Sequence, residues 1–199
     1  NTWVDQTAFD ADPDADDGTS LAETVLFNTN AFNNLADALA AVDAGGTIII
    51  NGGSGSYAGL TLNKDVTLQI SGEIAQAVTI TELSSVAGTT IDIEGTSALT
   101  VENAGNLSME GIISGSGSLT KTGAGTLTLA GANDYTGATT VSVGEILVAN
   151  DTALGTGAVG TTVAGGATLI LADGVTVVDE NVSISGAGDN FGGALKVEA

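Results

Sequence analysis

The densest group of potential metal ligands lies in the acidic run Asp10–Gly18, where Asp12, Asp14 and Asp16 occupy alternate positions. Calcium takes six to eight oxygen ligands, and alternating aspartates can supply them. Counted from Asp12, Glu23 falls at position twelve of a calcium loop, but glycine arrives one position later than such a loop requires. We therefore expect a solvated acidic loop and no cofactor. A calcium site at these three aspartates is the alternative.

Two acidic pairs are candidates for glycoside hydrolysis, namely Asp92 with Glu94 and Asp179 with Glu180. This reaction uses two carboxyl groups that flank the scissile bond. Acidic side chains are also the ordinary residues on the solvent face of a strand. We therefore expect no enzymatic activity, and a glycan-degrading enzyme is the less favoured alternative.

The composition excludes several other kinds of site. The 199 residues include 24 acids and only three cations (Lys64, Lys121 and Lys196), no His and no Cys, so that the formal net charge is −21. Zinc and iron–sulfur centres and His- or Cys-based nucleophilic catalysis therefore lack their ligands or bases. Nucleic acids and anionic membranes would repel such a chain. No apolar run is long enough for a membrane-spanning helix, so we expect no membrane insertion by this segment.

Two further residue types need an explanation at the sequence level. Tyr57 and Tyr135 stand next to glycines. They could stack on sugars, but at turns we expect them to pack against a neighbouring coil. We expect Lys121 to neutralise an acid in an adjacent coil.

Residues 32–42 have the pattern of an amphipathic helix. Four apolar residues recur at helical spacing on one face: Phe32, Leu35, Leu39 and Val42. Alanines raise the helix propensity between them. Thr29 or Asn30 can cap the start, and Gly45 with Gly46 can end the helix.

From residue 47 onward, short segments alternate apolar and polar residues and are separated by Gly, Asn and Asp, which predicts half-buried strands. The predicted strands are Thr47–Ile50, Leu60–Leu62, Val66–Ile70, Val78–Ile80, Ile91–Glu94, Leu99–Glu102, Leu127–Leu129, Val141–Val143, Leu169–Leu171, Val175–Val177, Val182–Ile184 and Leu195–Val197.

These strands are too short and too poor in aromatic residues for a typical sandwich. They favour an all-β fold, a right-handed parallel β-helix with one short N-terminal capping α-helix. Its thin interior accepts stacked aliphatic residues, and the 29 glycines provide the corners. Coils of roughly 20 residues fall in the range of solenoid repeats, so about seven would follow residue 47.

Two regions are expected. Residues 1–46 would form an N-terminal cap made of a short strand at residues 2–5, the acidic loop and the helix, because a solenoid must cover its open strand edges. Residues 47–199 would form the coils. Residues 192–199 have the pattern of a strand interrupted within a coil, so we expect the natural protein to continue and this chain to be truncated at its C-terminal end.

The segment Phe32–Ile48, followed by Ser56–Leu62 and Lys64–Leu68, resembles the opening of bacterial pectin-lyase-like β-helix proteins. In that family a short helix and a Gly-Gly-Thr turn start the first coil, and a Gly-x-Tyr turn follows. Lyases of this fold use calcium-bound carboxylates and a basic Arg or Lys. This chain has no Arg, and its three Lys are far apart in the sequence.

The segment Gly111–Leu129, continued by Gly131–Val141 and Gly144–Val148, resembles the passenger-associated repeat of autotransporters. We place this repeat at residues 111–150. Glu145 stands where Thr is usual, a change we expect to be harmless at an outward position. The resemblance implies a β-helical stalk of a surface-exposed or secreted protein that is exported through an outer-membrane barrel.

Together these features predict a structural stalk segment of a secreted or surface-exposed bacterial β-helix protein with an adhesin-like role. A self-assembling extracellular filament, joined end to end, is the alternative. The expected partners are neighbouring coils or domains of the same long protein and an extracellular glycan or protein ligand. No nucleic-acid partner is expected.

Overall fold

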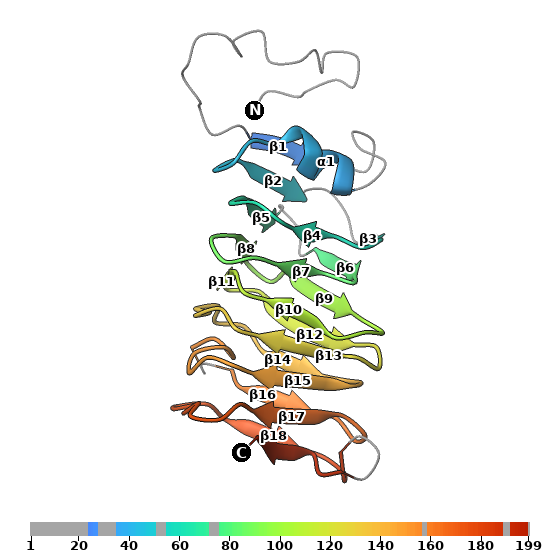
Figure 1. Ribbon diagram of the computed structural model, residues 1–199, viewed down its shortest axis with the longest axis vertical. Helices are drawn as coiled ribbons and strands as arrows, with labels where there is room; N and C mark the ends of the chain where they lie inside the picture. The colour runs from blue at the N-terminus through green and yellow to red at the C-terminus, as the bar shows by residue number, and fades with distance from the viewer. Residues whose placement is uncertain are drawn as a thin grey trace, which may run out of the picture.

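The computed structural model of the chain describes residues 24–27, 35–50, 55–71, 76–156, 159–188 and 192–198. Within these residues the fold is a parallel β-helix of three sheets, as Figure 1 shows. Sheet A contains β1 (Thr24–Phe27), β2 (Thr47–Ile50), β5 (Thr67–Ile70), β8 (Thr90–Ile93) and β11 (Ile112–Gly115). Sheet B contains β3 (Gly55–Tyr57), β6 (Ala77–Thr81), β9 (Ala98–Glu102), β12 (Ser118–Thr122), β14 (Thr139–Val141), β16 (Thr161–Val163) and β18 (Val182–Ile184). Sheet C contains β4 (Thr61–Leu62), β7 (Ser84–Ser85), β10 (Leu107–Met109), β13 (Thr126–Leu129), β15 (Glu145–Val148), β17 (Thr168–Leu171) and β19 (Leu195–Val197).

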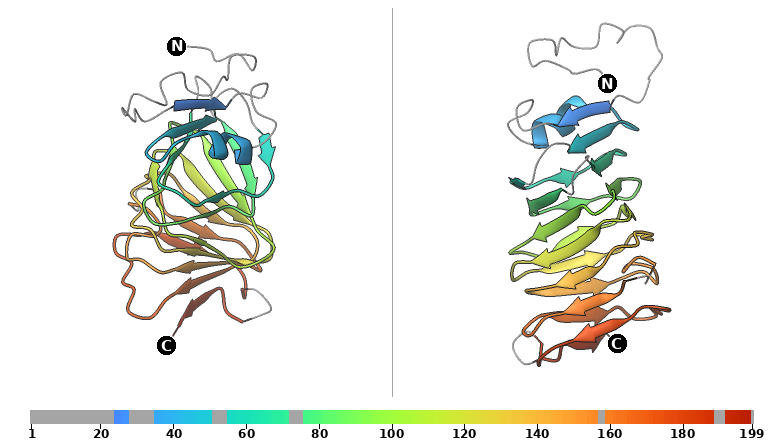
Figure 2. Two further views of the ribbon diagram at one scale, coloured as in Figure 1. Left: turned by 45° about the horizontal axis from the view of Figure 1, so that its top comes forward. Right: turned by 180° about the vertical axis from the view of Figure 1, so that it is seen from behind.

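The chain visits the three sheets in turn, and every strand pair is parallel. Paired residues lie between 19 positions apart, as for Thr126 and Glu145, and 26 positions apart, as for Leu169 and Leu195. The seven strands of sheet B are therefore separated by six turns of the chain. The stacked turns are visible from behind in Figure 2. The predicted parallel β-helix is confirmed.

The core consists of inward side chains stacked from coil to coil. In sheet A, Ile48 pairs with Leu68, Leu68 with Ile91 and Ile91 with Ile113, and all four are fully buried. Burying one such side chain contributes roughly 1.5–3 kcal/mol, so each column of the ladder stabilises the stack along its length.

The only helix among the described residues is α1 (Leu35–Ala41), which lies beside β1 and β2 at one end of the stack (Figure 1). Leu35, Ala38, Leu39 and Val42 are buried, which confirms the predicted apolar face. The chain leaves the helix through Gly45, whose φ of 86° suits glycine. The helix is far too short to cross a membrane. Phe32 and the predicted caps at residues 29 and 30 lie outside the described residues.

Sheet A is shorter than the other two sheets because it ends at β11. In the later coils the corresponding segments form no strand. The predicted strand Val175–Val177 is therefore wrong. The preceding coil offers no extended partner at this corner, since residues 151–154 form a turn there. Val175 and Val177 still pack against the core, so the alternation itself is real.

Strand β1 was not predicted, yet Thr24 to Phe27 pair in register with Thr47 to Ile50. The predicted strand at residues 2–5 and the acidic loop lie outside the described residues. The division of the chain at residue 46 stays a prediction.

Candidate functional site

Glycines in the middle coils stack directly on one another. The pairs Gly105 and Gly125, Gly111 and Gly131, and Gly117 and Gly137 are each 20 positions apart. A Cβ atom on Gly125, Gly131 or Gly137 would lie 2.0 Å from the carbonyl oxygen of its partner in the preceding coil. Real Cβ atoms do not come so close to backbone oxygen, so only glycine allows these coils to approach each other here.

Lys121 lies inside the solenoid, although lysine is among the residues least often buried. It belongs to an inward column of sheet B, between Val101 and Val141. Its Nζ donates hydrogen bonds to Thr122 O at 2.7 Å, Gly123 O at 2.7 Å and Val143 O at 3.3 Å. The ammonium thus holds the turn after β12 and reaches the turn of the following coil.

The pKa of Lys121 depends on its burial and on nearby carboxylates. Burial lowers its pKa to about 8, and the negative charges of Glu145 and Glu82 partly oppose this shift. Lys121 therefore interacts with the charge of Glu145 in the following coil, but its ammonium is bound directly by backbone carbonyls and not by a carboxylate. In the described part of the chain the ion pair is formed by Lys196 and Glu145.

A buried asparagine lies next to the same corner. Asn103 is fully buried, and its Nδ2 donates to Gly105 O and, at 3.1 Å, to Thr126 O. Its Oδ1 is buried without a hydrogen-bond partner. The Asn103 side chain therefore joins two consecutive coils at the corner between sheets B and C.

A second asparagine closes the edge at which sheet A ends. Asn133 Oδ1 accepts a hydrogen bond from Ile113 N at 2.8 Å, and its Nδ2 donates to Ala153 O at 2.6 Å. One side chain therefore connects three coils and satisfies a strand donor that would otherwise be exposed at the edge. It takes the place of a sheet A strand in the coil that follows β11.

Tyr135 follows in the same coil and fills the interior. It is fully buried, and its hydroxyl shares a hydrogen bond with Thr139 Oγ1. Burial raises the pKa of Tyr135 far above its usual range. The expected packing of Tyr135 is confirmed, and this ring cannot stack on a sugar. Tyr57 also packs against the core.

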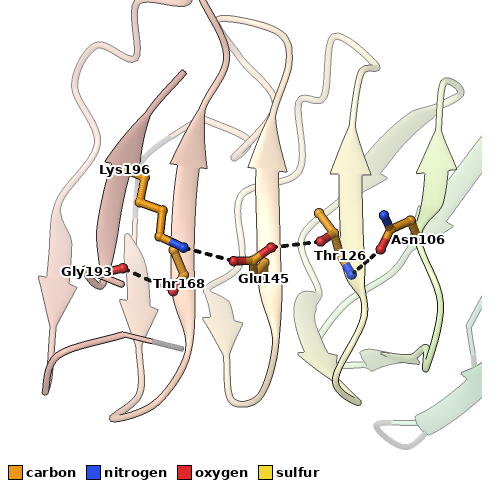
Figure 3. A network of polar contacts seen from close by, with 6 residues as sticks. All are labelled: Asn106, Thr126, Glu145, Thr168, Gly193 and Lys196. Atoms are coloured by element: carbon orange, nitrogen blue, oxygen red, sulfur yellow. Dashed lines mark hydrogen bonds and ion pairs between the residues drawn. The ribbon is translucent and has the colours of Figure 1, made fainter. Parts of the chain in front are cut away.

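On the outer side of sheet C, polar residues form a row across the coils, drawn in Figure 3. Thr126 N donates to Asn106 Oδ1 at 3.3 Å, and Thr126 Oγ1 donates to Glu145 Oε2 at 2.9 Å. Glu145 Oε1 pairs with Lys196 Nζ at 3.2 Å. Both charged side chains are partly exposed, so the row contributes little stability by itself. Glu145 thus links its coil to the preceding coil through Thr126 and, across β17, to the coil of β19 through Lys196.

Residues 119–148 match the model of the Passenger-associated-transport-repeat. This segment therefore resembles a passenger-associated transport repeat, and residues 119–148 are called the passenger repeat below. No curated protein and no solved structure matches the chain significantly.

The passenger repeat and the solenoid together fit an autotransporter passenger. The predicted resemblance at residues 111–150 is thus confirmed, with the family match covering residues 119–148. The repeat contains Lys121, Asn133, Tyr135 and three of the stacked glycines. The pectin-lyase-like start stays a prediction.

The candidate glycosidase acids take part in contacts between coils. Asp92 Oδ1 accepts a hydrogen bond from Ser114 Oγ at 3.3 Å, and Glu94 accepts one from Gln69. Burial and the neighbouring charges of Glu94 and Asp134 raise the pKa of Asp92, while the Ser114 hydrogen bond lowers it.

The second candidate pair lies nearer the C-terminal coil. Glu180 Oε1 accepts a hydrogen bond from Thr161 Oγ1 at 2.6 Å, and Asp179 is an exposed residue with a φ of 57°. These contacts give all but Asp179 a structural role.

The calcium candidates Asp12, Asp14 and Asp16 lie outside the described residues, so the calcium site stays a prediction. Among the residues that the structure describes, no group of three or more acidic side chains could hold a metal ion. The buried polar residues Asn103 and Asn133 were missed, because asparagine in a glycine-rich segment indicates an exposed turn as readily as an inward one.

Proposed function

We propose that the chain is a segment of the structural stalk of a secreted or surface-exposed bacterial autotransporter passenger. The observation that carries this proposal is the continuous register through the passenger repeat. Lys121 pairs with Val101 before the repeat, and Leu147 within it pairs with Ile170 beyond it. A load along the axis is therefore carried by consecutive backbone ladders and not by a hinge.

A pair of deletions tests this function in the displayed protein. Because Leu119 pairs with Thr139, removal of residues 119–138 joins one coil to the next in register. Removal of residues 119–128 instead shifts every later inward residue away from its column. Export and cell-surface display of an N-terminal tag are measured by accessibility to external protease.

The in-register deletion should retain display and shorten the stalk by one coil, about 4.8 Å. The shorter deletion should abolish display. Equal display of both deletion variants would contradict a stalk that depends on continuous stacking.

We also propose an adhesin-like role toward an extracellular glycan or protein. Its support is a column of paired hydroxyl residues along the outer face of sheet B: Ser56, Thr79, Thr100, Thr120, Thr140, Thr162 and Ser183. None carries a charge on a chain of net charge −21. Thr100→Lys with Thr120→Lys should reduce adherence to host cells, while Thr128→Lys on sheet C should not. Unchanged adherence of the double variant would refute this role for sheet B.

End-to-end self-association is the second candidate. It is favoured by exposed apolar side chains of β19, since Leu195 is 50% and Val197 69% exposed. The net charge of −21 opposes assembly unless salt or calcium screens it. Light scattering during a calcium titration should rise, and Val197→Glu should suppress the rise. A chain that stays monomeric throughout would count against the filament.

We propose that the segment has no enzymatic activity. Its candidate carboxylates Asp92, Glu94 and Glu180 hydrogen-bond neighbouring coils. The purified chain should not cleave polyuronides. Cleavage that is lost on substitution of a single acid would overturn this assignment.

A further inference from the structure

The Lys121 site has more than a packing role because the number of its hydrogen bonds depends on its protonation state. An ammonium group has three N–H donors, and the structure provides three carbonyl acceptors for them. A neutral amine has two N–H donors, so one acceptor must lose its bond.

The bond to Val143 O is the one that deprotonation should release. It is the longest of the three, at 3.3 Å against 2.7 Å for the other two. Val143 also belongs to the following coil, whereas Thr122 and Gly123 directly follow Lys121 in the chain. Val143 is 49% exposed, so the turn that it belongs to lies at the surface of the solenoid, where water is available.

We propose that Lys121 is a proton-operated link between two coils of the passenger repeat. In the ammonium form it ties the turn after β12 to the turn between β14 and β15. In the amine form it releases Val143 and Gly144, while the strands on either side remain stacked.

Burial and the charges around Lys121 together set the pH at which this change occurs. Burial lowers the pKa of Lys121 to about 8, and the carboxylates of Glu145 on β15 and Glu82 between β6 and β7 raise it. Glu102 lies at the exposed end of the neighbouring strand β9. Of the other strands beside Lys121, β13 and β14 carry no charged residue.

Local opening and global stability should move in opposite directions. The folded pKa of Lys121 is below that of the unfolded chain, 10.5. Between about pH 8 and pH 10.5 the unfolded state therefore binds more protons, and the contribution of Lys121 to stability rises with pH. Opening of the turn in this range is thus distinct from general alkaline unfolding.

The test is an NMR pH titration of the full chain from pH 6 to pH 11. The amide shifts of Val143 and Gly144 should titrate with a midpoint near pH 8, and their hydrogen exchange, corrected for pH, should increase across it. Lys121→Met should abolish the transition, and Lys64→Met should leave it unchanged. A midpoint above pH 10, or the same transition in Lys121→Met, would overturn the proposal.

A second variant keeps the test decisive if Lys121→Met does not fold. Glu145→Gln removes a carboxylate that raises the pKa of Lys121. The midpoint of the Val143 amide shift should therefore lie at lower pH in Glu145→Gln than in the wild-type chain. An unchanged or higher midpoint would contradict the proposed link.

Discussion

The N-terminal coils and the passenger repeat use glycine in different ways. Before the repeat, a Cβ atom on Gly45, Gly95 or Gly105 would meet nothing within 4 Å, and collisions with the preceding coil begin at Gly111. In the repeat, a Cβ atom on Gly125 or Gly131 would collide with the backbone of the preceding coil. The first group permits turns, and the second permits close stacking of coils. Two regions of the same solenoid therefore differ in what their glycines are for.

Buried polar residues occur in both regions, as Asn103 before the repeat shows, but individual columns of inward residues differ in composition. The sheet A column of Ile48, Leu68 and Ile91 is wholly aliphatic. The repeat instead places Lys121 and Asn133 in its interior, and each bonds to more than one coil. Buried hydrogen bonds are directional, so these residues specify the register of the repeat in a way that aliphatic stacking alone does not.

The largest expected effect separates two glycines of one column. Gly125→Ala places a Cβ atom 2.0 Å from Gly105 O, and neither glycine has a positive φ. We expect Gly125→Ala to lower the free energy of unfolding by about 3 kcal/mol, the upper range for overpacking. Gly105→Ala should change it by less than about 0.5 kcal/mol, as an exposed substitution does. Urea unfolding measures both, and equal losses would break the comparison.

A smaller loss is expected at the edge of sheet A. Asn133→Ala leaves the Ile113 N–H without its acceptor and removes the bond to Ala153. An unsatisfied buried group costs about 1–3 kcal/mol, so we expect a loss of about 2 kcal/mol. The control is Asn106→Ala, whose exposed Oδ1 accepts a longer bond of 3.3 Å. If Asn106→Ala destabilised the chain as much, Asn133 would have no special role.

The ion pair of Glu145 and Lys196 should contribute less to the free energy of unfolding than Gly125 or Asn133. Because both side chains are partly exposed, a double-mutant cycle with Glu145→Gln and Lys196→Met should give a coupling energy of about 0.2–1 kcal/mol. It should fall further in high salt. A coupling energy above about 2 kcal/mol, or one that salt leaves unchanged, would disagree with the exposed geometry.

The smallest effect concerns pH at Asp92. Its folded pKa is raised, chiefly by burial, so the folded state binds a proton more readily than the unfolded state. Asp92 therefore opposes folding at neutral pH, and this effect disappears once the acid is protonated in both states. Asp92→Asn should raise the melting temperature slightly at pH 7 and leave it unchanged near pH 3. A lower melting temperature at pH 7 would reverse the inferred sign.

Alternating apolar residues were sufficient to predict most strands and the stacking of coils, because a period of two fixes which face is buried. They were insufficient at Ser84 and Ser85 of β7, where the chain carries no apolar pattern and is held by pairing with its neighbours. They also misled at Val175–Val177, where the pattern is present but the preceding coil turns away.

The candidate site was less accessible from sequence. A lysine in an alternating segment could be placed on the inward face from its position, but its partners depend on where the next coil brings its carbonyls. Asn133 likewise acts on residues 20 positions away on either side. Such contacts depend on the stacking geometry, which local sequence patterns do not contain.

We infer that the coils of the passenger repeat are more tightly stacked than the coils of β2 and β5. Native-state hydrogen exchange on the full chain tests it most directly, because it resolves local opening from global unfolding. We predict that amides of β12, β13 and β15 exchange only through global unfolding, while those of β2 and β5 exchange earlier through local opening. Faster exchange in the repeat than in the N-terminal coils would contradict the account.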